Sequence, residues 1–287
     1  MSDAFIPERP VIAAYPKMPG TFTEAQAMSG YLKEQGIEAP YGSLYDEALR
    51  KRVRRGEFDL LIMAGGDGSV LRAGNLCAPS KVPILGVNLG RLGFLIQIEK
   101  EEWREYFDKL LKGEAWIETR MMLHAEHIRS GEMLGSWDAL NEVVVGRGQI
   151  LRPIRLSVSV DGRHLTSYVA DGLIAATATG STAYALAAGG PILPPELRNI
   201  LLVPIAPHLS VDRAVVLAEG SIVSMKINGE NAVLSVDGQP SITLLEDDHV
   251  DIRAADVTAQ FVRFGDPGYF YRNLTAHMNE NSLGLPR

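Results

Sequence analysis

The stretch LLIMAGGDGSVLRA, residues 60–73, contains the features that decide the fold of this chain. The nearly continuous apolar run at residues 58–64 is typical of a strand covered on both faces, as in a parallel sheet. The glycines that follow predict a tight turn, and Ser69 begins a helix. Unpaired N–H groups at such a helix N-terminus suit an anionic phosphate. We therefore expect a phosphate-binding turn made of Gly65, Gly66, Gly68 and Ser69.

Asp67 lies in the middle of this turn, where a carboxylate would repel a phosphate. A carboxylate in this place has another task, which is either to accept a proton from an attacking hydroxyl or to hold Mg²⁺. The alternative is that Asp67 only supports the turn and caps the helix, as aspartate often does. The GGDG sequence differs from the Rossmann GxGxxG and Walker GxxxxGKS loops, so it indicates neither of those folds.

Strands and helices alternate in the first third of the chain. Apolar runs predict strands at residues 11–15 and 82–88, and periodic patterns predict helices at residues 21–35, 46–55 and 99–111. The first of these helices has a capping-box pattern at Thr21 and Thr23. This alternation predicts an α/β domain with a parallel sheet.

After residue 113 the pattern changes to strand-like segments followed by turn dipeptides. Asp161-Gly162, Asn228-Gly229 and Asp237-Gly238 each follow an alternating segment, which is the strongest short-range signal for a hairpin. We expect an α/β domain over residues 1–115 and an antiparallel, sandwich-like β domain over residues 116–265. Residues 266–287 form a helical tail that we expect to pack back on the α/β domain.

Composition excludes several classes of protein. The 287 residues, of which 46% are hydrophobic and 22% charged, are typical of a globular chain that needs no disulfide or metal to hold its core. The net charge of −7 argues against a general nucleic-acid binder, and basic residues 51–55 are interpreted as a solvated helix face.

The single cysteine, Cys77, is interpreted as a buried small hydrophobe rather than a catalytic thiol. Residues 1–10 lack the apolar core of a secretory signal, and glycines and prolines interrupt the uncharged residues 172–195, so we expect a cytoplasmic protein that makes no membrane contact.

Two more segments point to a polar ligand. Asn141 and Glu142 begin an apolar strand, although a surface strand end would look the same. Asp171 begins another strand, which leads into a Thr/Gly/Ser turn and then a short helix of small residues over residues 183–188. Small hydroxylated residues at a helix start offer donors to a ligand, and Tyr184 can pack against a ring. The alternative interpretation is a tightly packed helix start.

The chain resembles the NAD kinase family in seven segments, which occur in the family's order along almost the whole chain. They are GGDGS (65–69), NLGRLGFL (88–95), NEVVVGR (141–147), DGLIAATATGSTAYALAAGGPI (171–192), PIAPHLSVDRAVVL (204–217), SVDGQ (235–239) and FYRNL (270–274). GGDG alone is shared with lipid kinases and 6-phosphofructokinases. The long segment that begins at residue 171 is the one specific to this family.

The resemblance implies both a fold and a reaction. The fold is of the NAD kinase/diacylglycerol kinase-like type, with an α/β N-terminal domain, an all-β C-terminal domain and the active site between them. The reaction is phosphoryl transfer from ATP, or from polyphosphate in some members, to the adenosine ribose 2′-hydroxyl of NAD, giving NADP. The resemblance also implies a homodimer or homotetramer. Phosphoryl transfer needs charge neutralisation, and the glycine loop contains no lysine, so we expect Mg²⁺ or another divalent metal held by the ATP phosphates and assign it no protein ligand.

The resemblance also implies roles for individual residues. Asp67 matches the base that activates the 2′-hydroxyl, and the glycines around it match the triphosphate-binding turn. The positions that match the NAD pocket are Asp67, Gly68, Phe94, Asn141, Glu142, Asp171, Thr179, Thr182, Ala183, Tyr184, Ala206, His208 and Gln239.

Two other functions share some of these features. A lipid or sphingoid-base kinase also carries GGDG, but it needs an apolar acceptor cavity, whereas the uncharged segment of this chain is rich in Thr, Ser and Gly. A non-catalytic NAD(P)-binding module would not need a carboxylate facing the phosphates, which is where Asp67 is expected.

Overall fold

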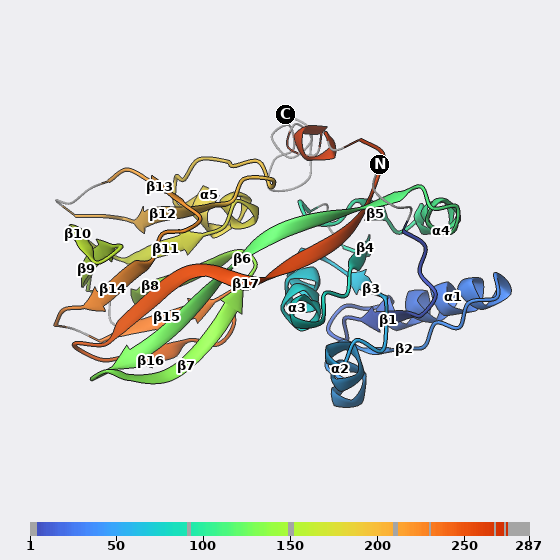
Figure 1. Ribbon diagram of the computed structural model, residues 1–287, viewed down its shortest axis with the longest axis horizontal. Helices are drawn as coiled ribbons and strands as arrows, with labels where there is room; N and C mark the ends of the chain where they lie inside the picture. Colours follow the sequence, from blue (N-terminus) through green and yellow to red (C-terminus); the bar gives the residue numbers. More distant parts are fainter. Residues whose placement is uncertain are drawn as a thin grey trace. The chain divides into compact units, whose positions relative to one another are not determined.

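The computed structural model describes residues 5–90, 93–148, 152–208, 212–229, 231–266, 268–272 and 274 (Figure 1). The chain divides into two compact units, Met1–Thr119 with Ala259–Arg287, and Arg120–Thr258. Strands β6 (Ala115–Arg129) and β17 (His249–Phe264) each contribute residues to both units. The first unit is α/β and the second is mostly antiparallel β, which confirms the predicted fold class.

Parallel strands form the centre of the first unit. β2 (Tyr41–Ser43), β1 (Pro10–Ala14), β3 (Leu60–Gly65) and β4 (Ile84–Asn88) are neighbours in that order, and β4 also pairs with β5 (Ile98–Glu99). Every residue of β1, β3 and β4 is buried, as their continuous apolar sequences predict. The register places Gly65 opposite Asn88, so the carboxyl ends of β3 and β4 meet at one edge of the sheet.

Helices cover this sheet. α1 (Thr21–Glu34) and α4 (Trp103–Leu111) share one hydrophobic cluster with β1, β3 and β4. α3 (Asp67–Cys77) contacts β3 and β4, and α2 (Glu47–Arg54) and the short turn η1 (Ala78–Ser80) pack against it. Cys77 is buried in α3, and burial raises the pKa of its thiol. The interpretation of Cys77 as a small hydrophobe is confirmed.

The ends of the helices differ in part from the sequence prediction. The capping box was wrong: α1 follows Gly20 without a side-chain cap, because Thr21 Oγ1 donates instead to the carbonyls of Tyr15 (2.9 Å) and Met18 (3.0 Å). α4 begins at Trp103 rather than at residue 99, because residues 98–99 pair with β4. In α2, Asp46 is the N-cap, and its carboxylate accepts the N–H of Leu49.

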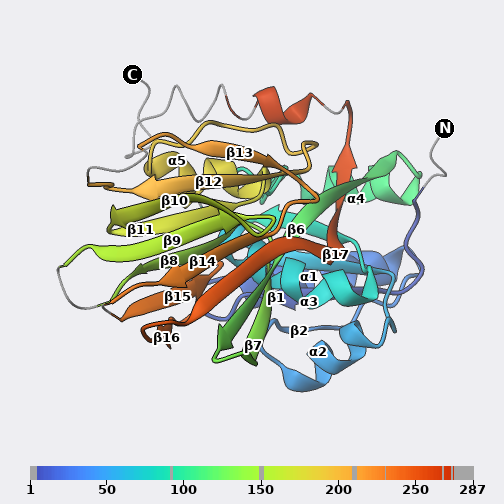
Figure 2. The same cartoon turned by 60° about the vertical axis from the view of Figure 1, so that its left-hand side comes forward.

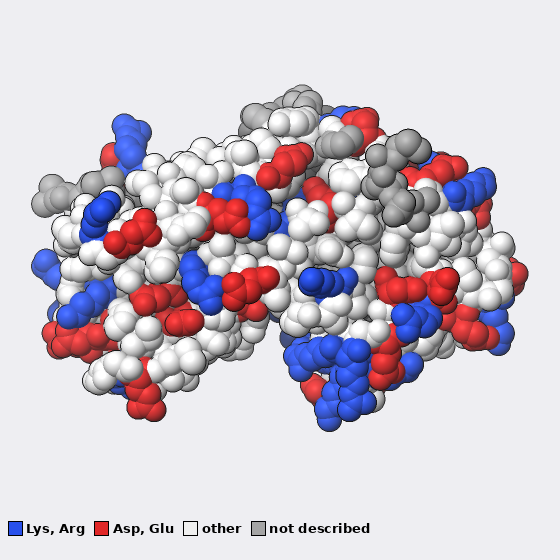
Figure 3. Space-filling view, in the orientation of Figure 1, with Lys and Arg blue, Asp and Glu red and all other residues white. Residues whose placement is uncertain are grey.

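A group of basic side chains covers the outer side of α2 (Figure 3). Lys51, Arg52, Arg54 and Arg55 are exposed, and Arg52 and Arg55 form ion pairs with Glu57. The group is therefore the solvated helix face that the sequence predicts.

The second unit is a sandwich of two antiparallel layers (Figure 2). One layer is β13 (Val215–Ala218), β12 (Asn199–Ile205), β11 (Gly172–Ala176), β8 (Glu142–Arg147), β15 (Ala232–Val236) and β16 (Ile242–Leu244), in spatial order. The other contains β10 (Arg163–Ala170), β9 (Ile154–Val160), β14 (Val223–Ile227) and part of β17, and β7 (Glu132–Ala139) pairs with β6. Apolar side chains of both layers form one core, whereas α5 (Tyr184–Ala187) covers a smaller cluster on the outer face of the six-stranded layer.

Two of the three predicted hairpin turns are confirmed. Asp161-Gly162 joins β9 to β10, and Asp237-Gly238 lies between β15 and β16; all four residues have positive φ. The hairpin at Asn228-Gly229 was wrong, because β14 pairs with β9 and β17 while the next strand, β15, belongs to the other layer. The Asn228 side chain donates instead to Ser157 Oγ (2.7 Å).

The C-terminal tail is described only in part. Of the predicted tail over residues 266–287, residues 267, 273 and 275–287 lie outside the described residues. Tyr269 and Phe270 are buried, and the Tyr269 hydroxyl donates to the carboxylate of Glu118 in the first unit. Within the described ranges, no helix is long and apolar enough to cross a membrane.

A buried ionic cluster stabilises the turn before β17. The fully buried Asp248 accepts two hydrogen bonds from Arg129 (2.7 and 2.8 Å) and one from the N–H of Leu245 (2.8 Å), and it lies 2.8 Å from Nε2 of buried His127. Burial alone raises the pKa of Asp248, but these hydrogen bonds outweigh burial and hold its pKa well below the ordinary value.

We expect Asp248→Asn to lower the free energy of unfolding by about 3 kcal/mol, because it removes one partner of a buried ionic cluster. Chemical denaturation of the whole chain measures this loss. Asp247→Asn is the matched control, because Asp247 pairs with Lys226 on the surface and should contribute less than about 1 kcal/mol. Equal losses in the two variants would contradict the expectation.

Candidate active site

The glycine turn joins the end of β3 to the start of α3. Gly65 is the last residue of β3, Gly66 is the N-cap of α3, and Asp67 is its first residue. Ser69 Oγ donates to the Gly66 carbonyl (2.6 Å), so this hydroxyl holds the turn together. Among the described residues outside the helix backbone, the nearest atom to a Cβ on Gly68 would be Arg72 Nη1, at 3.9 Å. The packing of the described residues therefore does not require glycine at position 68.

Backbone N–H groups from the loop after β4 bind the carboxylate of Asp67. Its Oδ2 atom accepts the N–H of Phe94 (2.7 Å) and the N–H of Leu95 (3.2 Å). A Cβ atom on Gly93 would lie 2.2 Å from the Asp67 carboxyl carbon, so only glycine fits at this position. The loop thus surrounds one side of the carboxylate and fixes its orientation.

This geometry argues against the alternative in which Asp67 only supports the turn and caps the helix. The N-cap of α3 is Gly66, and the helix has no side-chain cap. Asp67 Oδ2 accepts hydrogen bonds from a separate loop, nearly thirty residues further along the chain. Asp67 therefore does more than support its own turn.

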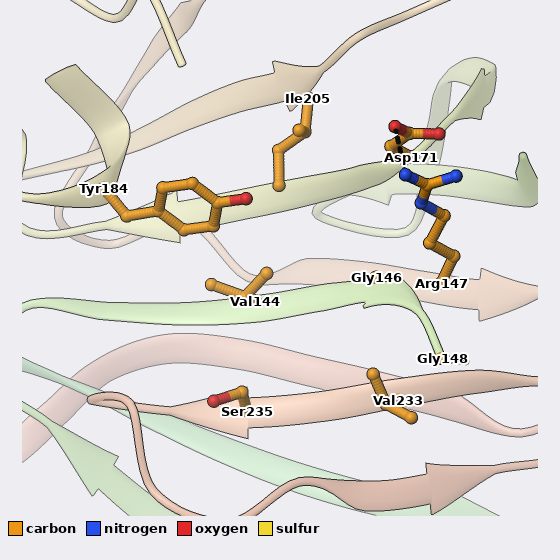
Figure 4. A pocket seen from close by; sticks show the side chains of 9 residues that line it. All are labelled: Val144, Gly146, Arg147, Gly148, Asp171, Tyr184, Ile205, Val233 and Ser235. Carbon is orange, nitrogen blue, oxygen red and sulfur yellow. Dashed lines mark ion pairs between the residues drawn. The ribbon is translucent and has the colours of Figure 1, made fainter. Parts of the chain in front are cut away.

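The outer face of the six-stranded layer carries a pocket of about 320 Å³ (Figure 4). Val144, Ile205 and Val233 supply its apolar surface. Arg147 and Asp171 form an ion pair at 3.2 Å, and the hydroxyl end of Tyr184 points toward that pair. The complete lining is Val144, Gly146, Arg147, Gly148, Asp171, Tyr184, Ile205, Val233 and Ser235. An apolar surface with a few polar groups is typical of a site for a small organic ligand.

The start of β8 is held by a carboxylate from the β15–β16 turn. Asp237 accepts the N–H groups of Leu140 (2.8 Å), Asn141 (2.8 Å) and Glu142 (3.1 Å). On the other side, Gly180 approaches so closely that a Cβ atom would lie 2.1 Å from the Asn141 carbonyl oxygen. The backbone at Asn141 and Glu142 is therefore fixed from both sides.

Asn141 and Glu142 each bury a polar atom that the chain does not satisfy. Among the described residues, Asn141 Oδ1 and Glu142 Oε2 have no hydrogen-bond partner, although both residues are at least nine-tenths buried. Burial, and next the nearby Asp237 charge, raise the pKa of Glu142 to about 7, against the opposing effect of the Tyr184 N–H. Such atoms are costly to a fold unless a ligand binds them.

The remaining predicted site residues all lie in the second unit. Thr179 and Thr182 lie in the short turn η2 (Thr179–Thr182), directly before Ala183 and Tyr184, and buried Arg120 donates to Thr179 Oγ1 (3.3 Å). Ala206 has a φ of 45°, and the His208 N–H donates to the Val169 carbonyl. Gln239 is exposed in the turn after β15 and does not line the pocket.

The predicted site residues thus belong to two groups. Asp67, Gly68 and Phe94 lie in the first unit, at the glycine turn and the loop after β4. Asp171 and Tyr184 line the pocket of the second unit, and Asn141 and Glu142 lie at the start of β8, the strand that contributes Val144 and Gly146 to the same pocket. These contacts leave the binding roles of individual residues as predictions.

Sequence reasoning missed several pocket residues. Arg147 lies inside the NEVVVGR segment, but its pairing with Asp171 depends on the register of β8 against β11. Ser235 reaches the pocket because it pairs with Val144 across β15 and β8. Period-two alternation along these strands could have placed their outward residues on one face, but not opposite one another. Asp237 was interpreted only as a turn residue.

No group of three or more His, Cys, Asp or Glu side chains that could hold a metal ion occurs in the part of the chain that the structure describes.

Family models match both units. Residues 17–115 match the ATP-NAD kinase N-terminal domain, and residues 140–264 match the ATP-NAD kinase C-terminal domain. Among curated proteins, an NAD kinase of Chloroflexus aurantiacus is 38% identical over 275 residues, which cover 96% of this chain and 99% of that protein. An NAD kinase of Chloroflexus aggregans is 44% identical over 224 residues, 78% of this chain and 81% of that protein.

Solved structures with similar folds come from the same group of proteins. A yeast NADH kinase complexed with NADH superimposes with a TM-score of 0.81 at 25% identity, covering 96% of this chain and 89% of that one. An NAD kinase from Archaeoglobus fulgidus in complex with ATP superimposes with a TM-score of 0.75 at 27% identity, covering 93% of this chain and 97% of that one.

The buried Glu142 leads to a prediction about stability. Because its pKa is about 7 in the folded chain and 4.5 is the ordinary value, the folded state keeps a proton that the unfolded state loses between these pH values. Stability therefore falls as the pH rises from about 4.5 to about 7, in total by about 3 kcal/mol. Glu142→Gln should remove this loss.

We expect Glu142→Gln to raise the melting temperature more at pH 8 than at pH 5, as measured by calorimetry without nucleotide. The exposed Glu246, changed to Gln, is the control and should leave the melting temperature unchanged at both pH values. A destabilised Glu142→Gln variant at pH 8 would show that the carboxylate serves the fold instead.

Proposed function

The chain belongs to the NAD kinase family, and on this premise we propose that it transfers a phosphoryl group from ATP to the adenosine ribose 2′-hydroxyl of NAD, giving NADP, with Asp67 as the general base. The observation that carries the proposal is the setting of Asp67, whose carboxylate is held by two backbone N–H groups beside an open glycine turn at a helix N-terminus. The alternatives of a lipid kinase and a binding-only module are not favoured by the relatives.

In the proposed reaction the 2′-oxygen attacks the γ-phosphorus of ATP. A bond forms between these two atoms, the bond from the γ-phosphorus to the β,γ-bridging oxygen breaks, and ADP leaves. The Asp67 carboxylate accepts the 2′-hydroxyl proton. Because phosphoryl transfer depends mainly on positioning and charge neutralisation, holding the acceptor oxygen in line is as important a role for Asp67 as accepting the proton.

The glycine turn binds the triphosphate in this proposal. Backbone N–H groups at Gly66 and Gly68, together with the positive end of the α3 dipole, face the phosphate oxygens. The turn contains no lysine, in contrast to a Walker loop. A divalent metal such as Mg²⁺, bound by the ATP phosphates, supplies the remaining positive charge.

The second unit binds the adenosine half of NAD. The unpartnered Asn141 Oδ1 and Glu142 Oε2 are acceptors, and they suit the amino group of adenine and the ribose hydroxyls as donors. The Tyr184 ring offers a surface for packing. The residues proposed to bind NAD are Asp67, Gly68, Phe94, Asn141, Glu142, Asp171, Thr179, Thr182, Ala183, Tyr184, Ala206, His208 and Gln239.

The assembly and location of the enzyme are also part of the proposal. Membership of the family supports a homodimer or homotetramer in the cytoplasm. Light scattering of the purified chain tests the assembly, since a monomer at working concentration would contradict it.

We expect Asp67→Asn to lower kcat by about 10²–10⁴-fold with the fold intact, because asparagine can still accept the two N–H groups but cannot take a proton. Product formation from NAD, ATP and Mg²⁺, detected with an NADP-specific dehydrogenase, measures the loss. The control is Asp59→Asn, because the Asp59 carboxylate also accepts two backbone N–H groups, those of Glu8 and Arg9. Asp59 directly precedes the first residue of β3, whereas Asp67 follows the last. Full activity of Asp67→Asn would refute the assignment.

Gly68→Ala separates a ligand requirement from a packing requirement. Because the described residues leave room for a methyl group at Gly68 and alanine favours helix, we expect stability to be kept or raised. If phosphate approaches this backbone, loss of one hydrogen bond to a charged group should raise the KM for ATP by about ten- to a hundredfold.

Gly30→Ala is the matched control, because Gly30 lies inside α1 and, apart from the helix's own backbone, no atom of the described residues lies within 4 Å of a Cβ there. It should stabilise the chain similarly without changing the KM for ATP. An unchanged KM in Gly68→Ala would remove this part of the turn from the triphosphate site.

A further inference from the structure

A chain of hydrogen bonds leads away from Asp67 into the core of the first unit. The N–H of Leu95 donates to Asp67, and the carbonyl of Leu95 accepts a hydrogen bond from Arg263 Nη1 (2.8 Å). Arg263 Nε in turn donates to Glu118 Oε2 (2.8 Å). Leu95 is therefore held on both of its peptide groups, by the carboxylate on one side and by the guanidinium on the other.

The position of Arg263 is strongly constrained. Its side chain is 2% exposed, and its guanidinium carbon lies 5.0 Å from the ring centre of Phe261 and 4.7 Å from that of Tyr269. The Tyr269 hydroxyl donates to both oxygens of Glu118, the ion-pair partner of Arg263. A guanidinium fixed in this way cannot move without moving the Leu95 carbonyl.

Stability alone does not account for this pair of charges. A buried ion pair costs desolvation, and apolar residues of similar volume often replace one without loss. Arg263 also leaves its Nη2 atom buried without a hydrogen-bond partner among the described residues, which adds to the cost. What an apolar residue could not supply is the hydrogen bond to the Leu95 carbonyl.

We propose that Arg263 is a positioning residue for phosphoryl transfer, because it holds the Leu95 carbonyl and so fixes the two N–H groups that orient the Asp67 carboxylate. The inference rests on the proposed function, in which Asp67 contacts the ribose hydroxyl. Arg263 itself contacts neither substrate in this proposal and acts only through the loop after β4.

The test replaces the ion pair as a whole. In the double variant Arg263→Met/Glu118→Leu both charges are removed, so no unpaired charge stays buried. We expect the variant to fold with a lower melting temperature, because the Tyr269 hydroxyl and the Leu95 carbonyl each lose a hydrogen bond. We expect a kcat lowered by roughly ten- to a hundredfold at a temperature where both proteins are folded, since a small misplacement of a reacting group has effects of this size. The KM values for NAD and ATP should change little, because binding contacts are kept.

Gln97→Leu is the matched control. Gln97 forms two hydrogen bonds with the backbone of Phe264, the residue after Arg263, but it bonds neither Leu95 nor Asp67. It should leave kcat unchanged. If the double variant does not fold, Arg263→Lys replaces it, because lysine keeps the charge beside Glu118 without the fork that also reaches Leu95; a folded lysine variant with the kcat of the parent would overturn the inference.

Coupling to Asp67 separates this inference from the function on which it rests. Adding the Arg263→Met/Glu118→Leu change to Asp67→Asn should cause little further loss of kcat, because the orientation of an absent base has no effect. If the two separate losses of kcat multiplied in full in the combined variant, the positioning role of Arg263 would be overturned. Full activity of Asp67→Asn alone would overturn the assignment of Asp67 as the general base, on which this inference rests, whereas an impaired Asp67→Asn beside an unimpaired double variant would overturn only the inference about Arg263.

Discussion

The hydrogen bonds from the N–H groups of Phe94 and Leu95 to Asp67 Oδ2 are the interaction on which the rest of the first unit depends. They require β3 and β4 to be adjacent and parallel, so that the turn after one strand meets the loop after the other. They require glycine at position 93, since a larger residue would displace the carboxylate. The Asp67 carboxylate is thereby given one orientation at the N-terminus of α3, whose partial positive charge favours a carboxylate there.

The second unit uses the same device at another place. Asp237 accepts three consecutive N–H groups and so presents Asn141 and Glu142 at the start of β8. Its charge also raises the pKa of Glu142, after the larger effect of burial. In each unit, then, a carboxylate accepts backbone N–H groups of a separate segment. In the second unit, Asn141 Oδ1 and Glu142 Oε2 have no hydrogen-bond partner among the described residues, and the family resemblance matches both residues to the NAD pocket. Buried acceptors of this kind lower stability and are retained where a ligand needs them.

Local signals in the sequence predicted those features whose cause is also local. The buried strands, the glycine turn and the Asp161-Gly162 hairpin depend on neighbouring residues, and all three are present. The prediction failed where a distant partner competes with a local preference. Thr21 bonds the carbonyls of the preceding turn instead of capping α1, and the strand before Asn228-Gly229 pairs with strands remote in sequence rather than with the next one.

The sequence by itself determined the fold class, the position of Asp67 between a buried strand and a helix, and the segments that identify the family. These follow from composition, periodicity and motif, which need no knowledge of the register. Only the tertiary structure decided that Arg263 holds the loop around Asp67, that Arg147 pairs with Asp171, and that Asp237 orders the strand start at Asn141. Each of these contacts joins residues that strand pairing or loop packing brings together. The fold therefore sets the geometry, and the identity of the two residues does not by itself predict that they meet.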